Sequence, residues 1–186
     1  LQTEGLIKRY GALLVTDDVS LDIRSGELHA LIGPNGAGKT TLINQLSGEL
    51  QSNAGHIRFD GQDVTAAPIH QRARRGLLRS YQITSIFEEF TVLENAALSA
   101  LGARQHAWSF WRPMLANAKA RAAAEEAVEA AGLTRFASTA AGELAYGQRR
   151  QLELAMALAA QPKFLLLDEP MAGMSVQESA AVTELL

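Results

Sequence analysis

The 186 residues contain no cysteine. This absence excludes a disulfide scaffold and metal sites with thiolate ligands, and it fits a protein kept in a reducing cytosol. The sequence also lacks any apolar run near the ~18 residues that a membrane-spanning helix needs. Residues 1–9 mix acidic and basic side chains and do not form a secretory signal. We therefore expect any role at a membrane to depend on a partner protein.

Neither sign of charge dominates the sequence. Lysine and arginine number 17 against 20 aspartates and glutamates, which gives a net charge of -3. The chain therefore has no overall basic field that would attract nucleic acid or anionic lipid. There are also no internal repeats and no low-complexity linker, and the length suits one domain with a sizeable core.

The two ends of the chain indicate that the sequence is incomplete. It begins at Leu1 without a methionine. A capping-box pair, Ser175 and Glu178, opens a predicted helix that still runs at the last residue, Leu186. We therefore expect the C-terminal end of the domain to be missing from these residues.

The first part of the chain predicts short strands around a glycine-rich loop. Apolar and polar residues alternate over 19–23 and again over 57–59, where Asp60-Gly61 closes the run. The apolar run 28–32 predicts another strand directly before the loop. A helix is predicted from Thr40 onward. Its apolar face carries Leu42, Ile43, Leu46 and Leu50.

The middle of the chain predicts helices. Thr91 and Glu94 have capping-box spacing, so a helix is expected to begin there and to run through an Ala/Leu-rich segment to Leu101. The Ala-rich segment 114–131 predicts a second helix, and Gly132 stands where a helix C-terminal glycine would.

After this helical region the chain returns to a buried strand over residues 164–167. We interpret residues 83–155 as a helical insertion in an α/β core. That core is expected to consist of residues 1–82 and 156–186, so that the chain forms a single domain with an inserted helical subdomain.

Eight residues between the predicted strand and helix fit the phosphate-binding pattern G-x-x-x-x-G-K-[ST] at every constrained position. They are Gly33, Pro34, Asn35, Gly36, Ala37, Gly38, Lys39 and Thr40. The glycines let successive backbone N–H groups point at phosphate oxygens, and the following helix adds its positive N-terminal dipole. Lys39 can reach the β- and γ-phosphates, and the Thr40 hydroxyl can ligate Mg²⁺. The alternative, a glycine-rich turn that merely includes a lysine, explains less of the pattern.

A pair of acids follows the predicted strand at 164–167. In P-loop proteins this arrangement is called Walker B, and its strand lies parallel to the one that leads into the phosphate loop. Asp168 would hold Mg²⁺ directly or through water, and Glu169 could polarise the attacking water as a general base. Acidic residues also end ordinary strands, so this pair is informative only in combination with the phosphate loop.

The segment Leu144-Ala145-Tyr146-Gly147-Gln148 precedes a predicted helix. It resembles the signature motif of ATP-binding cassette proteins. In that family the signature of one subunit closes over the γ-phosphate held by the phosphate loop of another. A glycine-containing turn at a helix N-terminus suits such an anion. The resemblance therefore implies two composite ATP sites in a head-to-tail dimer, with these residues in contact with the nucleotide.

The resemblance covers nearly the whole chain and implies its fold class. That class is α/β, with a P-loop NTPase core built on a RecA-like, mostly parallel sheet. An antiparallel β subdomain and an inserted α-helical subdomain complete it.

The resemblance also assigns individual residues. Tyr10 stands where the family places the aromatic side chain that stacks on adenine, and Thr41 joins the nucleotide-binding set. Gln82 falls at the Q-loop, which senses Mg²⁺ and water and links the core to the helical subdomain. Residues 172–175 occupy a loop that reaches across the dimer. The implied catalytic residues are Lys39, Gln82 and Glu169, and the implied Mg²⁺ ligands are Thr40, Gln82 and Asp168.

The residues of the signature, Leu-Ala-Tyr-Gly-Gln, and the long insertion before them most resemble those of the subunits that serve branched-chain amino acid importers. This implies ATP hydrolysis coupled to import of branched-chain or other hydrophobic amino acids. The implied partners are a second ATPase subunit, in a homo- or heterodimer, integral membrane permease subunits and, indirectly, a solute-binding protein. The implied location is cytoplasmic, on the inner face of the cell membrane. The cassette does not touch the solute, so its sequence leaves the solute open.

Two departures from the family pattern stand out. The commonest signature has serine and glycine where this chain has Ala145 and Tyr146. Ala145 cannot donate a hydroxyl hydrogen bond to phosphate, so that contact must come from backbone N–H groups or from elsewhere. The switch histidine of the family is expected on a later strand, beyond Leu186.

Other polar and aromatic residues favour ordinary structural roles. The four histidines are too scattered for a local metal motif, which favours surface or core positions. The basic run Arg72, Arg74, Arg75 and Arg79 favours a solvated face over contact with an anionic partner. Trp108, Phe110 and Trp111 fit local packing or docking on a membrane partner equally well.

Two other function classes remain as alternatives. A soluble cassette ATPase acting on ribosomes or DNA would usually carry two cassettes or long coiled insertions, and the acidic balance of this chain also disfavours nucleic acid. A nucleotide-binding regulator without turnover is disfavoured by Glu169.

Overall fold

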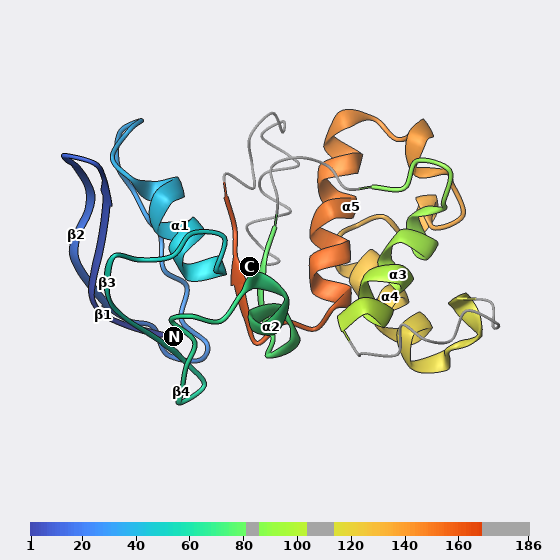
Figure 1. The fold of residues 1–186 in the computed structure, drawn as a ribbon. Helices are drawn as coiled ribbons and strands as arrows, with labels where there is room; N and C mark the ends of the chain where they lie inside the picture. The colour runs from blue at the N-terminus through green and yellow to red at the C-terminus, as the bar shows by residue number, and fades with distance from the viewer. Residues whose placement is uncertain (81–85, 104–113, 169–186) are drawn as a thin grey trace. The chain divides into compact units, whose positions relative to one another are not determined.

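In the computed structural model, residues 1–80, 86–103 and 114–168 are described, and all side chains in these ranges except that of Met114. The chain divides into two compact units, Leu1–Leu77 and Leu78–Leu186. Figure 1 shows that the first unit is built mainly of strands and the second mainly of helices. The helical insertion expected over 83–155, in a core made of 1–82 and 156–186, stays a prediction.

The first unit contains a four-stranded antiparallel sheet in the order β2-β1-β3-β4. The strands are β1 (Gln2–Tyr10), β2 (Leu13–Asp22), β3 (Ala54–Phe59) and β4 (Gln62–Asp63). Tight turns join β1 to β2 and β3 to β4, the second at Asp60-Gly61 as the sequence predicts. This sheet matches the antiparallel β part of the predicted fold class.

The ladder between β1 and β2 is irregular, and side-chain hydroxyls restore its hydrogen bonds. The register shifts between Thr3 and Leu6. The Thr3 hydroxyl accepts a hydrogen bond from the Leu21 N–H at 2.9 Å, and the Ser20 hydroxyl accepts one from the Gly5 N–H at 2.9 Å. Gly55 on β3 passes so close to Gly5 that a Cβ atom there would overlap its carbonyl group. Only glycine therefore fits where β3 crosses this bulge.

Helix α1 (Lys39–Ser47) lies in the same unit and buries Leu42, Ile43 and Leu46. Its fully buried Gln45 ties it to the sheet, because the Gln45 Oε1 atom accepts a 2.7 Å hydrogen bond from the Thr16 hydroxyl of β2. The Gln45 amide also donates to the Ser52 hydroxyl at 2.7 Å. Both ends of this buried amide are thus satisfied, which fixes the helix against β2.

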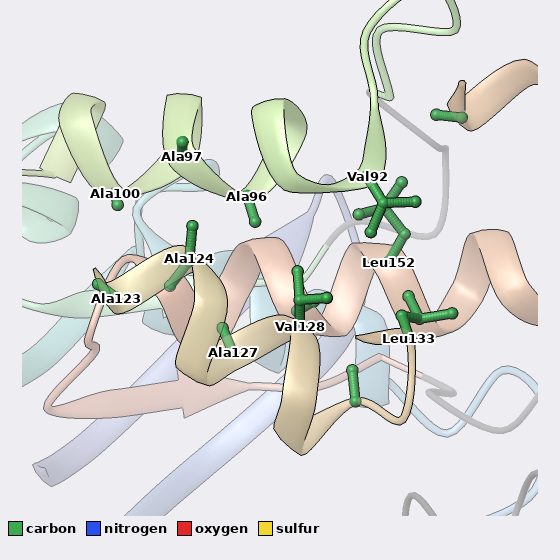
Figure 2. Close-up of a cluster of buried hydrophobic side chains, with 14 of the residues drawn as sticks. Val92, Ala96, Ala97, Ala100, Ala123, Ala124, Ala127, Val128, Leu133 and Leu152 are labelled. Carbon is green, nitrogen blue, oxygen red and sulfur yellow. The ribbon is translucent and has the colours of Figure 1, made fainter. Parts of the chain in front are cut away.

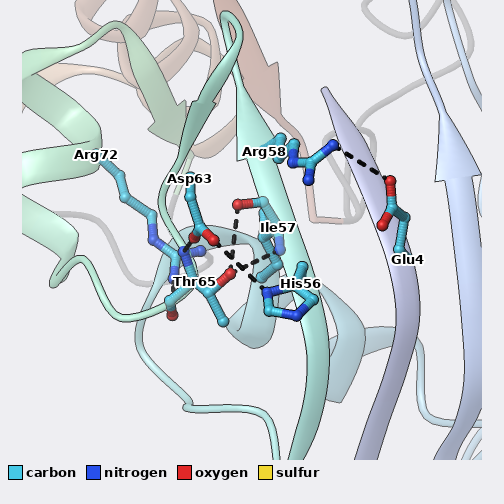
Figure 3. Close-up of polar contacts among 7 residues, drawn as sticks. All are labelled: Glu4, His56, Ile57, Arg58, Asp63, Thr65 and Arg72. Carbon is cyan, nitrogen blue, oxygen red and sulfur yellow. Dashed lines mark hydrogen bonds and ion pairs between the residues drawn. The ribbon is translucent and has the colours of Figure 1, made fainter.

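Arg72 closes the C-terminal end of α1. It lies on the short helix α2 (Ile69–Arg74) and is only 1% exposed. Its guanidinium group donates to four backbone carbonyl groups, shown in part in Figure 3: those of Gln45, Leu46, Thr65 and Ala67, at 2.8 to 3.0 Å. Burial lowers the pKa of this guanidinium from its ordinary value, while the Asp63 carboxylate acts in the opposite direction. The side chain therefore supplies hydrogen bonds to carbonyl groups at the end of α1 and in the segment before α2.

A two-stranded sheet is formed by β5 (Leu77–Arg79), which begins at the last residue of the first unit, and β6 (Phe164–Leu166). The Ser80 N–H donates to the Leu166 carbonyl group at 2.9 Å. The C-terminal ends of the two strands therefore lie side by side. This pairing places the ends of two segments that are far apart in the sequence next to each other.

Three helices form the rest of the second unit: α3 (Val92–Ala103), α4 (Ala118–Ala130) and α5 (Tyr146–Ala159). Single turns of 3-10 helix, η1 (Met114–Ala116), η2 (Thr134–Phe136) and η3 (Ala141–Glu143), lie between them. Their shared core consists mostly of alanine with a few larger side chains, such as Val92, Val128, Leu133 and Leu152 (Figure 2). Small side chains allow helices to approach closely, which suits the packing of these three helices against one another.

The predicted helix boundaries agree with the structure where caps are present. The Glu94 N–H donates to the Thr91 hydroxyl, and the Thr91 N–H donates to the Glu94 carboxylate, which confirms the capping box before α3. The second helix begins at Ala118 and not at 114, because the Asn117 side chain caps it by accepting from the Ala120 N–H. None of the helices within the described ranges is long and apolar enough to cross a membrane.

The structure contradicts two expectations. It assigns no strand to residues 28–32, where Leu28 and Ile32 are 76% and 89% exposed. An apolar run forms a strand only where a neighbouring strand offers hydrogen bonds, and composition does not reveal that neighbour. The solvated face predicted for the basic run is wrong for Arg72 and Arg79, since the first is buried and the second is 9% exposed at its side chain.

We predict that Arg72→Ala lowers the free energy of unfolding by about 3 kcal/mol, because it leaves several buried carbonyl groups without a partner. Arg74→Ala is the matched control: it removes an exposed arginine from the same helix and should change stability by less than about 0.5 kcal/mol. Urea denaturation measures both. Equal stabilities of the two variants would contradict the capping role of Arg72.

Candidate nucleotide-binding site

The glycine-rich loop runs into the N-terminus of α1 in a backbone conformation that requires glycine. Gly36 and Gly38 have φ angles of 81° and 90°. Gly38 is the N-cap of α1, and a Cβ atom there would come within 2.8 Å of the Val15 carbonyl oxygen of β2. A side chain at this position would have to push the loop away from the sheet. The glycines of the predicted motif are therefore needed for the loop to pass this close to β2.

The N-terminus of α1 offers backbone donors to an anion. The first helical hydrogen bond runs from the Leu42 N–H to the Gly38 carbonyl group at 2.9 Å, so the N–H groups of Lys39, Thr40 and Thr41 precede it. Glycine has no side chain to cap them. The first turn of α1, which lies wholly within the described part of the chain, carries no acidic residue. This cradle fits a phosphate group, which would complete the hydrogen bonding of the turn.

Lys39 lies along the same loop. Its ammonium group donates to the carbonyl oxygens of Gly33 at 2.6 Å and of Pro34 at 2.9 Å. These contacts keep a positive charge beside the backbone donors of the loop. A lysine held by two carbonyl groups can turn to a phosphate oxygen by rotating its flexible stem, and the stronger charge-assisted bond favours that exchange.

Tyr10, the predicted adenine partner, is the last residue of β1 and is 51% exposed. The Lys8 ammonium group lies 5.5 Å from the centre of its ring. A half-exposed aromatic ring can stack on a flat partner. Its stacking on adenine stays a prediction.

Asp168 lies two residues after the end of β6 in the second unit. Its Oδ2 atom accepts a 2.9 Å hydrogen bond from the Arg79 Nη2 atom, and the two side chains are 13% and 9% exposed. Within the described part of the chain, no three His, Cys, Asp or Glu side chains gather into a possible metal site. Mg²⁺ commonly binds through one or two protein oxygens together with substrate phosphates. A carboxylate such as Asp168 and a hydroxyl such as that of Thr40 are suitable ligands of that kind.

The predicted signature residues form the N-terminus of α5. Ala145 is the N-cap, and its N–H donates to the Gln148 Oε1 atom at 2.9 Å. This is half of a capping box, because the alanine methyl group cannot accept a hydrogen bond in return. The first turn of α5, all of it described, carries no acidic side chain. Its backbone donors are therefore available to an anion, as at α1.

Tyr146 gives this helix end an exposed aromatic ring. The side chain is 57% exposed, and its hydroxyl accepts hydrogen bonds from the Arg150 guanidinium group at 3.2 and 3.3 Å. Arg150 is held in turn by Glu153 at 2.8 Å, a contact that raises the pKa of the guanidinium from its ordinary value. The ring is thus oriented by a neighbouring ion pair one helical turn further on.

Arg149 anchors the signature to the segment before it. Its guanidinium group donates to the carbonyl oxygens of Gly142 at 2.7 Å and Leu144 at 3.1 Å, and it pairs with Glu88 at 3.0 Å. Asn95 is fully buried and makes several hydrogen bonds with the turn that contains Glu88, including a 2.9 Å bond from the Phe87 N–H to its Oδ1 atom. The turn after the predicted Q-loop and the signature are therefore fixed to each other.

Sequence reasoning placed some of these residues and missed others. Gln82, Glu169 and residues 172–175 lie outside the described residues, as do Trp108, Phe110 and Trp111. The roles of Arg79 and Arg149 were missed. Arg149 adjoins the signature and Arg79 lies three residues before Gln82, but a basic residue near a motif does not reveal its tertiary partner.

Comparison with known proteins gives consistent matches. The sequence profile of a family described as ABC transporter matches residues 16–172. The chain is 39% identical, over 96% of its length and 72% of the relative's, to the high-affinity branched-chain amino acid transport ATP-binding protein BraF of Pseudomonas aeruginosa. It is 37% identical over its whole length, and 75% of the relative's, to the LivG protein of the same description from Salmonella typhimurium.

A third relative is named for export. The lipopolysaccharide export system ATP-binding protein LptB of Haemophilus influenzae is 40% identical over 93% of this chain and 68% of that protein. Among solved structures, the ADP conformation of MJ1267, an ATP-binding cassette of an ABC transporter, superimposes with a TM-score of 0.83. That match has 28% identity and covers 99% of this chain and 74% of the other. The predicted α/β cassette fold is thereby confirmed.

We predict that Lys39→Met weakens ATP binding by about 10- to 100-fold, because it removes the charged donor from the phosphate loop. Lys119→Met, which removes an exposed lysine from α4, is the charge-matched control and should leave affinity unchanged. Titration with a fluorescent ATP analogue measures both. Unchanged affinity in Lys39→Met would overturn the assignment of the phosphate site.

We also predict that Ala145→Ser raises the free energy of unfolding by about 0.5–1 kcal/mol, because the serine hydroxyl completes the capping box with Gln148. Ala160→Ser, at the C-cap of the same helix, adds the same hydroxyl without an N-terminal donor to accept from and should give no gain. Chemical denaturation of the two variants tests this, and an equal effect of both would rule out the capping explanation.

Proposed function

The chain belongs to the ABC transporter family and is an ATPase of that family, and on this basis we propose that it energises the import of branched-chain or other hydrophobic amino acids. The observation that carries the proposal is its similarity, over nearly the whole chain, to two proteins named for high-affinity branched-chain amino acid transport. The sequence of the signature, residues 144–148, supports the same assignment.

We propose that the nucleotide is ATP and that it binds with Mg²⁺. The phosphates would lie on the loop of residues 33–38, against the backbone donors of α1 and the Lys39 ammonium group. Adenine would stack on Tyr10. The Mg²⁺ ligands would be Thr40, Gln82 and Asp168, and the ion would neutralise charge on the phosphates.

Hydrolysis would depend on positioned side chains and backbone groups. Glu169 would accept a proton from the attacking water, which Gln82 would help to orient. Lys39 and the donors at the start of α1 would stabilise the negative charge that develops on the phosphate. This division of roles agrees with the general pattern for phosphoryl transfer, in which the protein mainly positions reactants and stabilises charge.

The exposed start of α5 supports a dimer in which the sites are shared. Its first turn offers backbone donors, and Tyr146 is exposed and oriented beside them. We propose that residues 145–148 of one subunit close over the nucleotide on the phosphate loop of another, either a second copy or a similar ATPase subunit. Closing and reopening of this pair would move integral membrane permease subunits.

This assignment implies a peripheral position on the cytoplasmic face of the cell membrane, with a solute-binding protein as an indirect partner. The net charge of -3 disfavours a role on nucleic acid. A second candidate is export, which the similarity to the lipopolysaccharide export protein LptB favours. The ATPase chemistry is the same in both cases, and the membrane partners distinguish them.

The test is affinity purification of the full-length protein from its native cells in mild detergent, with an untagged strain as the control. We expect polytopic membrane proteins to co-purify, and a solute-binding protein with an amino-acid ligand to associate with them. Recovery of lipopolysaccharide export components would replace the import assignment. Recovery of ribosomes or DNA repair proteins would contradict transport and leave the ATPase assignment in place.

A further inference from the structure

The pairing of β5 with β6 brings together Arg79 and Asp168, which are 89 residues apart in the sequence. The Ser80 N–H donates to the Leu166 carbonyl group, which sets the two strand ends in register. Arg79 then donates to the Asp168 Oδ2 atom at 2.9 Å. The contact is therefore produced by the strand pairing and involves a residue already assigned to the metal.

This pair is more buried than the ion pairs on the surface of the molecule. Its side chains are 9% and 13% exposed, whereas those of Arg24 and Asp22, at 3.9 Å, are 78% and 56% exposed. Exposed pairs are screened by water and contribute little. A charge in a mostly buried position requires a partner, and removing one member leaves the other uncompensated.

We propose that Arg79 is a resident counter-cation of Asp168, which neutralises the carboxylate and excludes free Mg²⁺ from it. A guanidinium group and a divalent cation repel each other at one carboxylate, so each weakens the binding of the other. Phosphate groups bound with the metal would offset that repulsion. Arg79 therefore makes metal binding at Asp168 conditional on nucleotide. This inference rests on the proposed role of Asp168 as a Mg²⁺ ligand.

The test compares full-length wild-type protein with Arg79→Gln in the absence of nucleotide. Mn²⁺ binding, measured by electron paramagnetic resonance, should be at least about tenfold tighter in the variant, because one nearby positive charge is gone. Without metal, the variant should unfold about 5 °C or more below wild type. Millimolar Mg²⁺ should restore much of that loss in the variant and change wild type little.

Three further variants test whether the changed metal binding and stability arise from the contact between Arg79 and Asp168. Adding Asp168→Asn to Arg79→Gln should abolish the response to both metals. Arg24→Gln, which breaks the exposed pair, should behave as wild type in both measurements. Arg79→Lys keeps a charge but loses the fork geometry of the guanidinium group, so its Mn²⁺ affinity should lie between those of wild type and Arg79→Gln. It also serves as the test should Arg79→Gln fail to fold.

Unchanged or weaker Mn²⁺ binding in the folded Arg79 variants would overturn the proposal and leave Arg79 as a structural contact. A metal response that persists with Asp168→Asn would do the same. Neither measurement uses ATP, turnover or a membrane partner. Failure here therefore leaves the transport assignment intact, and failure of the co-purification experiment leaves this inference intact.

Discussion

The close approach of Gly38 to the Val15 carbonyl group is the constraint on which the nucleotide site depends. It lets the glycine-rich loop pass against β2 as it enters α1, with no side chain between them. The far end of α1 is held as well, through the buried hydrogen bond from Thr16 to Gln45 and the Arg72 guanidinium group. A helix fixed at both ends keeps its backbone donors pointed at one place, which is what stabilising phosphate charge requires.

The second unit also presents the N-terminus of a helix, here supported by other helices and not by a sheet. Its alanine-rich helices pack closely, and Asn95 and Arg149 tie the turn after the Q-loop to the start of α5. This arrangement presents another helix N-terminus without an acid in its described first turn, beside the exposed Tyr146. Each unit thus carries a helix N-terminus whose backbone N–H groups suit an anion, and we propose that the two ends have complementary roles around one nucleotide.

The parts that the sequence predicted well are those specified by local chemistry. The turn of residues 33–38 into α1 follows from the glycine spacing, although phosphate binding there stays a prediction, and the start of α3 follows from the Thr91 and Glu94 capping pair. The parts it predicted wrongly depend on distant partners. Residues 28–32 were expected to form a strand because of their composition, and the basic run was expected to be solvated because of its charge. The partners of Arg72 and Arg79 are carbonyl groups and a carboxylate that only folding brings near them.

The central claim is that the phosphate loop of one subunit and the signature of another form one site. The absence of cysteine from these residues allows a direct test. Asn35→Cys and Tyr146→Cys are made in separate full-length chains, which are mixed and oxidised with and without ATP and Mg²⁺. The account predicts a disulfide between the two kinds of chain that forms with nucleotide and is absent when either variant is oxidised alone. The absence of a nucleotide-dependent cross-link in the mixture would contradict it.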